Sequence, residues 1–166
     1  MKEYFYSEKI ISGIHFIVVT DGEAVKQILI NSALPSSLHN FIKTNPSDQN
    51  LLNAFIHLEE YFLESRKMFS VPLDPEGTEF QKRVWNEVMK IPYGKTLTYE
   101  QLAERIGNIK TIRAVGKANA SNPIPIIIPC HRVIGKNGSL VGYSAGTEIK
   151  RKLLILEKSF AASLFG

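Results

Sequence analysis

The residue best suited to chemistry is the single cysteine of the chain, Cys130, which His131 and Arg132 follow directly. A thiol is an effective nucleophile only as a thiolate, and a nearby base or positive charge favours that form. Adjacent side chains of an extended segment point to opposite faces. A direct hydrogen bond between His131 and the sulfur is therefore not guaranteed, and a water that bridges the two is the other possibility. The alternative is a buried, unreactive thiol, the commonest role of a lone cysteine. The neighbours of Cys130 favour the reactive role.

The segment before the cysteine is apolar and contains three prolines, at positions 123, 125 and 129. Proline removes a backbone donor and disrupts a helix, so this run is predicted to be extended and buried. Such a segment would hold Cys130 in a fixed place.

A second candidate lies in residues 111–120, which read as a short helix with Arg113 and Lys117 on one face. Gly116 costs about 1 kcal/mol relative to alanine inside a helix. That cost is understandable if the backbone must approach a ligand such as a DNA groove, with the two basic side chains contacting phosphates. The alternative is a solvated basic face without a partner.

The elements around these residues divide at about Pro75 into an N-terminal lobe, 1–75, and a C-terminal lobe, 76–166. In the first, residues 14–20 and 24–30 predict a β-hairpin around Asp21-Gly22, and 31–46 read as a loop. Apolar spacing predicts a helix from Ser47, and 69–73 a further strand. The N-terminal lobe is therefore expected to be α/β.

The C-terminal lobe is predicted to be mainly helical. Thr78 and Thr98 each precede a glutamine by three residues, the capping-box pattern that begins a helix. Gly107 is placed to end the second of these helices, and Thr111 to cap the next. Two short helices joined by a glycine-containing turn have the layout of a helix-turn-helix. A last helix is predicted over 148–158, capped by Thr147.

Composition and charge narrow the function classes. The chain has 166 residues, 44% hydrophobic and 22% charged, as in ordinary globular proteins. One cysteine excludes an intrachain disulfide and a cysteine-based zinc site. The net charge of +4 divides into −3 for residues 1–75 and +7 for 76–166, which suggests that the C-terminal lobe faces a polyanion. The N-terminus lacks the apolar core of a signal peptide, and a cytoplasmic location is expected, nucleoid-associated when bound to DNA.

Several separated motifs in 80–157 resemble those of the O6-alkylguanine-DNA alkyltransferases, also called methylated-DNA–protein-cysteine methyltransferases. They occur in the family's order and comprise Ile91-Pro92-Tyr93-Gly94, Thr98-Tyr99, Arg113-Ala114-Val115-Gly116, Asn122-Pro123, Pro129-Cys130-His131-Arg132-Val133, Gly142-Tyr143-Ser144 and Leu156-Glu157. The resemblance implies an α/β, ribonuclease-H-like N-terminal lobe with a small β-sheet, and a C-terminal DNA-binding and alkyl-transfer domain with a helix-turn-helix.

The resemblance also implies the reaction: the O6-alkyl group of a flipped guanine, mainly methyl, moves irreversibly to Cys130, with O4-methylthymine as a further substrate. His131 would act through water as the base, and Glu157 would orient it. Tyr99 would donate to a guanine ring nitrogen, and Asn122 would brace the turn. The residues expected to bind the base are Val133, Tyr143, Ser144, Pro125 and Asn119.

The DNA contacts implied by the resemblance lie on the predicted helix 111–120. Arg113 would fill the space left by the flipped base, and the other expected contacts are Thr111, Ala114, Gly116 and Lys117. Binding would be largely independent of sequence, by a monomer, without a metal, a cofactor or a membrane. Val141 and Ala145 stand where many relatives have smaller residues, which favours methyl over benzyl transfer.

Three alternatives stay open at the level of sequence. A lesion-binding protein without transfer would keep the fold, but the intact Pro129-Cys130-His131 argues against it. A helix-turn-helix regulator would need a dimer to read two half-sites, and no dimerisation helix is apparent. A cysteine hydrolase is the most distant alternative.

Overall fold

The computed structural model describes residues 3–36, 41–44 and 47–159. The chain divides into two compact units, residues 1–76 and 77–166, one residue beyond the predicted boundary. The first unit holds a small mixed sheet with a helix, and the second is mainly helical. None of the helices in the described ranges is long and apolar enough to cross a membrane.

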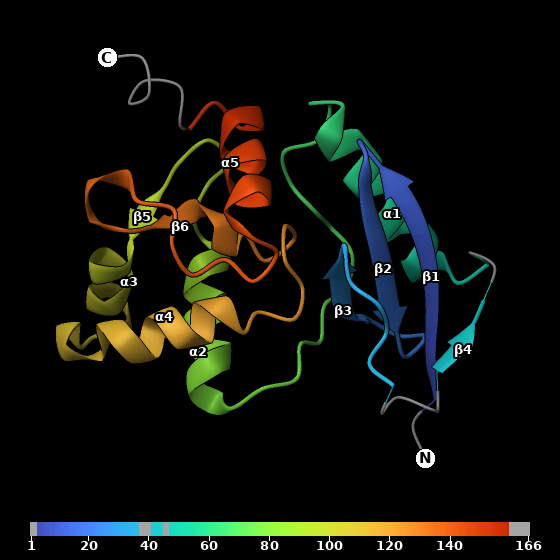
Figure 1. The fold of residues 1–166 in the computed structure, drawn as a ribbon. Helices are drawn as coiled ribbons and strands as arrows, with labels where there is room; N and C mark the ends of the chain where they lie inside the picture. Colours follow the sequence, from blue (N-terminus) through green and yellow to red (C-terminus); the bar gives the residue numbers. More distant parts are fainter. Residues whose placement is uncertain (1–2, 37–40, 45–46, 160–166) are drawn as a thin grey trace. The chain divides into compact units, whose positions relative to one another are not determined.

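The sheet of the first unit has the strand order β3-β2-β1-β4 (Figure 1). The predicted hairpin is confirmed as β2 (Ile14–Thr20) and β3 (Val25–Ile30), which pair antiparallel. Strand β1 (Tyr4–Ile11) pairs antiparallel with β2 and parallel with the short β4 (Phe41–Lys43). Neither β1 nor β4 was predicted, and β4 lies in the segment read as a loop. The rest of that segment is without strands where it is described, and 37–40 and 45–46 lie outside the described residues.

Helix α1 (Gln49–Phe62) packs against this sheet (Figure 1). It begins at Asp48, whose side chain accepts from the Asn50 and Leu51 backbone amides. The predicted apolar face is buried at Leu51, Phe55 and Leu58, whereas Phe62 is half-buried against the ring of Phe16. The predicted strand 69–73 is wrong: only Leu73 forms an isolated bridge, to Val25, because the chain passes β3 briefly and then turns away.

Within the described residues 77–159, the second unit contains four α-helices with short strands and turns between them. Their order is α2 (Glu79–Met89), β5 (Leu97–Thr98), α3 (Tyr99–Ile106), η1 (Ile109–Thr111), α4 (Ile112–Ala120), η2 (Cys130–Arg132), β6 (Val133–Ile134), η3 (Lys136–Gly138) and α5 (Thr147–Leu156). Helix α2 packs against α3 and α4. Strands β5 and β6 pair in parallel, which brings the segment after the cysteine beside the start of α3 (Figure 1).

Both predicted capping boxes are confirmed. The Thr78 and Thr98 side chains accept from the backbone three residues on, and Gln81 and Gln101 return the bond. Gly107 ends α3 at φ 99°, a left-handed conformation that glycine adopts without steric cost. These signals are local, so the sequence is enough to predict them.

Two predicted caps are wrong. The Thr111 hydroxyl donates back to the Asn108 carbonyl, and Asn108 itself caps the preceding 3₁₀ turn, so α4 begins without a side-chain cap. Thr147 is the first helical residue of α5, and Gly146, at φ 94°, precedes it. Thr111 thus stands at the N-cap position of α4 with its hydroxyl bonded backwards, whereas Thr147 lies one residue past the N-cap position of α5.

Candidate active site

The turn that carries Cys130 is braced by Asn122. Its side-chain nitrogen donates to the Ile128 carbonyl at 2.8 Å, and its oxygen accepts from the Ile124 amide at 3.0 Å. Between them Ile126 is held at φ 73°, a conformation that β-branched residues rarely adopt. The Cys130 amide donates to the Ile128 carbonyl at 2.8 Å. Asn122 therefore closes a strained loop whose end is the cysteine.

The prediction that this segment is extended is wrong, although its burial is confirmed. Residues 122–129 form successive turns, and Cys130 opens the 3₁₀ turn η2, Cys130–Arg132. Proline excludes a regular helix but is compatible with tight turns, and three prolines favour them here. In a 3₁₀ turn consecutive side chains fan out around the axis, so the argument from opposite faces of a strand does not apply to Cys130 and His131.

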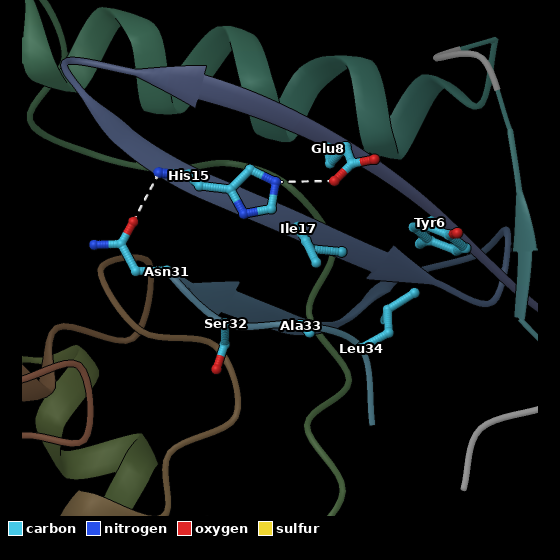
Figure 2. Close-up of a pocket in the computed structure, with 8 residues that line it drawn as sticks. All are labelled: Tyr6, Glu8, His15, Ile17, Asn31, Ser32, Ala33 and Leu34. Atoms are coloured by element: carbon cyan, nitrogen blue, oxygen red, sulfur yellow. Dashed lines mark hydrogen bonds and ion pairs between the residues drawn. The ribbon is translucent and has the colours of Figure 1, made fainter. Parts of the chain in front are cut away.

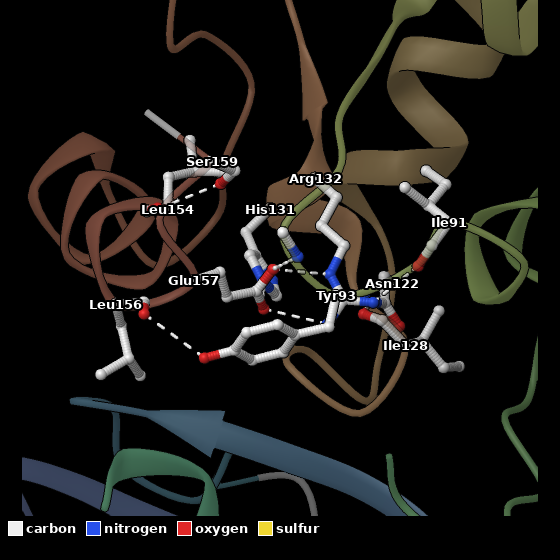
Figure 3. Close-up of polar contacts among 11 residues, drawn as sticks. Ile91, Tyr93, Asn122, Ile128, His131, Arg132, Leu154, Leu156, Glu157 and Ser159 are labelled. Atoms are coloured by element: carbon white, nitrogen blue, oxygen red, sulfur yellow. Dashed lines mark hydrogen bonds and ion pairs between the residues drawn. The ribbon is translucent and has the colours of Figure 1, made fainter. Parts of the chain in front are cut away.

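Glu157, at the C-terminal end of α5, joins His131 and Arg132 (Figure 3). Its Oε1 lies 2.8 Å from His131 Nε2 and 2.9 Å from Arg132 Nη2, and its Oε2 accepts from Arg132 Nε at 2.9 Å. The Gly94 amide also donates to Oε2, at 3.2 Å. All three side chains are buried. The structure thus brings the predicted pair His131 and Glu157 together and adds Arg132.

The charges of this cluster fix the protonation of His131. The pKa of Glu157 falls to about 2 despite burial, because His131 and Arg132 donate to it. An ionised carboxylate only accepts, so the imidazole carries its proton on Nε2 and leaves Nδ1 as an acceptor. Burial lowers the pKa of His131, which favours the neutral ring. Nδ1 is buried and has no hydrogen-bond partner in the described part of the chain.

Cys130 is buried and free. Burial raises the pKa of its thiol to about 11, against the hydrogen bond of Asn122, the charge of Lys150 and the backbone amides of Cys130 and His131, which lower it. The resting thiol therefore holds its proton at neutral pH. A base is needed to remove it, and His131 Nδ1 is the nearest group in sequence with an open lone pair.

Unpaired polar atoms gather around the cysteine. In the described ranges five buried side-chain atoms lack a hydrogen-bond partner: Thr44 Oγ1, His57 Nδ1, Asn119 Oδ1, His131 Nδ1 and Tyr143 Oη. The last three belong to the same unit as Cys130. Asn119 donates to the Cys130 carbonyl at 3.2 Å, and the pKa of Tyr143 is raised by burial and by the charge of Cys130. Buried polar groups are normally paired, so this concentration indicates a site that receives a polar ligand.

Tyr99, Val133 and the segment 141–143 line the same region. Tyr99 Oη donates to the Val141 carbonyl at 2.7 Å. Gly142 has φ 71°, and a Cβ there would lie 3.0 Å from Tyr99 Oη, so the close approach requires glycine. Val133 is fully buried in β6.

Three other predicted positions differ in exposure. Pro125 is buried and forms an isolated bridge with Ile128, inside the turns before Cys130. Ala145 is half-buried and Ser144 is exposed, both after Tyr143.

Lys150 is a component of the site that sequence analysis missed. Its side chain is fully buried, and Nζ donates to the Val133 carbonyl at 2.6 Å and the Val141 carbonyl at 3.1 Å. Nζ also lies 5.8 Å and 6.0 Å from the ring centroids of Tyr99 and Tyr143. Burial lowers its pKa to about 8. The spacing of the sequence could have identified it, because positions 150, 153, 154 and 157 lie on one face of a helix and Lys150 therefore shares the face of Glu157.

Helix α4 presents two different faces. Arg113, Ala114 and Lys117 are exposed, while Val115 and Asn119 are buried. Thr111 and Gly116 are half-buried. The buried face reaches the cysteine turn through Asn119, so the exposed basic face belongs to the same helix as a residue of the site.

A separate pocket lies in the first unit (Figure 2). His15 Nε2 contacts Glu8 Oε2 at 2.9 Å within it, and the His15 amide donates to Asn31 Oδ1 at 3.0 Å. The remaining lining residues are Tyr6, Ile17, Ser32, Ala33 and Leu34. No predicted site residue lines it. Across the described residues, no group of three or more histidine, cysteine, aspartate and glutamate side chains could hold a metal ion.

The chain is similar to known proteins over both units. Residues 79–159 match the family model described as 6-O-methylguanine DNA methyltransferase, DNA binding domain. A methylated-DNA–protein-cysteine methyltransferase of Methanosarcina acetivorans is 61% identical over 102 residues, which cover 61% of this chain and 65% of the relative.

Solved structures match over a longer range. The crystal structure of the Mycobacterium tuberculosis O6-methylguanine methyltransferase has a TM-score of 0.86 and 37% identity, covering 94% of this chain and 93% of that one. A structure of M. tuberculosis OGT in complex with DNA has a TM-score of 0.83 and 38% identity, covering 95% of this chain and 93% of that one.

Proposed function

The chain belongs to the 6-O-methylguanine DNA methyltransferase family, and from that premise we propose that it repairs DNA by moving the O6-alkyl group of a damaged guanine onto Cys130. The observation that carries the proposal is the set of unpaired buried atoms near the cysteine, Asn119 Oδ1, His131 Nδ1 and Tyr143 Oη. A polar planar base would supply partners for Asn119 Oδ1 and Tyr143 Oη, and a water between Cys130 and His131 would supply the partner of Nδ1. The name of the M. acetivorans relative and the DNA complex of the M. tuberculosis protein support the same reaction and partner.

The transfer is a displacement at the alkyl carbon. His131 Nδ1 takes the Cys130 proton through a water, and the thiolate sulfur forms a bond to the alkyl carbon as the bond from that carbon to O6 breaks. The electron pair stays on the guanine, and a ring nitrogen takes the proton of Tyr99 once Tyr99 leaves the Val141 carbonyl. The imidazolium of His131 then returns a proton to Tyr99 through solvent. Glu157 stabilises the imidazolium while it exists. The thioether has no route back to thiol, so one chain acts once.

In this proposal the carbonyls of Cys130 and Val133 receive the exocyclic amine of guanine, and both already have a partner. The Cys130 carbonyl accepts from Asn119 and from the Val133 amide, whereas the Val133 carbonyl accepts from Lys150 among side chains. A carbonyl has two lone pairs. Val133 therefore has the more accessible acceptor, while Cys130 has to lose a partner to bind the base. Ser144 is exposed, and in this proposal its backbone amide donates to O6.

Duplex DNA would bind on the exposed face of α4. Arg113 is exposed there and would fill the gap left by the flipped base, while Lys117 would contact phosphate. In this proposal α3 and α4 act as the helix-turn-helix. The ribonuclease-H-like character of the first unit, monomeric binding and the cytoplasmic location rest on the same sequence expectations.

Duplex DNA carrying radiolabelled O6-methylguanine tests the proposal. Label is expected on the peptide that contains Cys130, one methyl group per chain, with no further turnover. The Cys130→Ser variant should bind the duplex and take up no label, and a duplex with ordinary guanine gives the background. Lesion binding without label on wild-type protein would favour a damage-binding protein instead.

The alkyl preference has its own test. Methyl is expected to transfer faster than benzyl, since Val141 and Ala145 are larger than the residues of many relatives. Side-by-side rates with methyl- and benzyl-substituted guanine measure this, and equal or faster benzyl transfer contradicts it.

A further inference from the structure

We propose that Arg132 is a positioning residue of this site, which fixes the Glu157 carboxylate and keeps His131 neutral so that it can accept a proton. The proposal rests on the function proposed above. It gives a role to the one buried charged side chain of the cysteine turn that the reaction itself does not use.

The geometry of Arg132 is that of a clamp. Nε and Nη2 donate to the two oxygens of Glu157, each at 2.9 Å, in a two-pronged contact that fixes the plane of the carboxylate. Nη1 donates to the Ile91 carbonyl at 2.6 Å, which anchors the other side of the guanidinium. Its carbon lies 5.8 Å from the centroid of the Tyr93 ring. Arg132 thus has little freedom to turn, and neither has the carboxylate it holds.

His131 shares an acceptor with this clamp. Glu157 Oε1 receives both His131 Nε2 and Arg132 Nη2, so the position of the imidazole depends on a carboxylate that Arg132 has already oriented (Figure 3). The two donors are consecutive in the chain, and the 3₁₀ turn spreads their side chains to approach Glu157 from two sides.

The charged groups around His131 support the same role for Arg132. The charged groups acting on His131 are Glu157 and Lys150 from α5 and Arg132 from η2. Glu157 raises the pKa of the imidazole, while Arg132 and Lys150 oppose it and burial lowers it most. Without Arg132, the full charge of Glu157 would act on His131 and favour the imidazolium. A protonated His131 cannot take the proton of Cys130.

The test compares Arg132→Gln, Arg132→Lys and a control, Arg83→Gln. Arg83 donates to the Ile106 carbonyl, so the control removes an arginine–carbonyl contact of the same unit that involves no carboxylate. Two quantities are measured as a function of pH: the single-turnover transfer rate, and the titration of His131 by ¹⁵N NMR.

The acid limb of the rate and the His131 midpoint are both expected to move to higher pH in R132Q, by about one pH unit or more. R132K keeps the positive charge but loses the two-pronged contact. Its acid limb and its His131 midpoint should therefore move in the same direction by a smaller amount. R83Q should match wild type. A lower rate in R132Q with neither midpoint moved would overturn the proposal. A merely structural role would change the size of the transfer rate and leave the pH of both midpoints unchanged.

Two further results keep the test decisive. Should R132Q fail to fold, as judged from Trp85 fluorescence, an unmoved His131 midpoint in R132K overturns the proposal. Should wild-type protein transfer no alkyl group, the proposed function fails, but the NMR titration still decides whether Arg132 sets the protonation of His131.

Discussion

Glu157 contributes a buried negative charge whose stabilising effect depends on pH. Its pKa of about 2 in the folded chain lies below the ordinary value of 4.5, so its contribution is fully present above pH 4.5. It is lost as the pH falls from 4.5 toward 2, and the difference corresponds to about 3 kcal/mol. The lowered pKa of His131 acts in the same direction below about pH 6.5, because the unfolded chain then binds a proton that the folded chain does not.

The free energy of unfolding of the second unit is therefore expected to fall on acidification, gently below pH 6.5 and steeply below 4.5. Glu157→Gln should lower it at pH 7 by about 3–5 kcal/mol, because Arg132 is left without its buried partner. The same variant should lose the steep decline below pH 4.5. Urea unfolding followed by the fluorescence of Trp85, the single tryptophan of the chain, measures both effects in the second unit.

A surface carboxylate supplies the control for this prediction. Glu104 is exposed on α3, and Glu104→Gln should keep the wild-type decline. A steep decline that persists in E157Q would contradict the assignment to Glu157.

At the scale of elements, the sequence predicted what depends on neighbours in the chain. The capping boxes of α2 and α3 and the glycine at the end of α3 are local signals, and the structure contains all three. Strand β1 was missed because Ser7, Glu8 and Lys9 interrupt its apolar pattern, and its pairing with β2 is what forms the strand. The 3₁₀ turn at Cys130 was missed for a related reason, since proline excludes a helix without choosing between extended chain and turns.

The prediction of the site residues succeeded and failed in the same way, according to whether the signal was local or depended on distant contacts. Cys130, His131, Asn122 and Glu157 were predicted, and the structure brings them into one buried group. Lys150 was missed because its role depends on contacts with distant carbonyls, which a single sequence does not encode. A lysine on the apolar face of a helix is the signal that could have identified it.

Helix α4 supports a prediction about Gly116. An added Cβ there would lie 3.9 Å from Tyr99 Cδ1, an ordinary contact, so Gly116→Ala should raise the free energy of unfolding by about 1 kcal/mol. If the glycine is retained to let DNA approach the backbone, the same substitution should weaken duplex binding several-fold. Urea unfolding and fluorescence anisotropy with a labelled duplex measure the two effects.

Gly107→Ala, at the end of α3, is the contrasting control for the stability effect of Gly116→Ala. Gly107 has φ 99° and open space around its Cβ position, so alanine should cost about 1–2 kcal/mol for conformational reasons. Unchanged duplex binding in G116A would mean that α4 does not need a small residue there for close approach.

At the scale of the whole molecule, the charge is divided between the units. Residues 1–76 carry −4 and residues 77–166 carry +8, and the exposed basic face of α4 lies in the second unit. A net charge of +4 averaged over the chain would attract DNA weakly. The division concentrates the attraction on the unit that holds Cys130, as the proposed repair of damaged DNA requires.

The salt dependence of duplex binding tests this division with the full chain. Each phosphate contact adds about 0.9 to the slope of log Kd against log salt concentration, so Lys117→Gln should reduce that slope by about 0.9. Lys9→Gln is the matched control, because Lys9 is paired with Glu59 at 2.5 Å in the first unit and should leave the slope unchanged. Fluorescence anisotropy on an undamaged duplex between about 50 and 200 mM salt gives both slopes. Equal losses of slope in K117Q and K9Q would mean that DNA responds to the net charge of the chain, and that the basic face of α4 is not the surface that binds it.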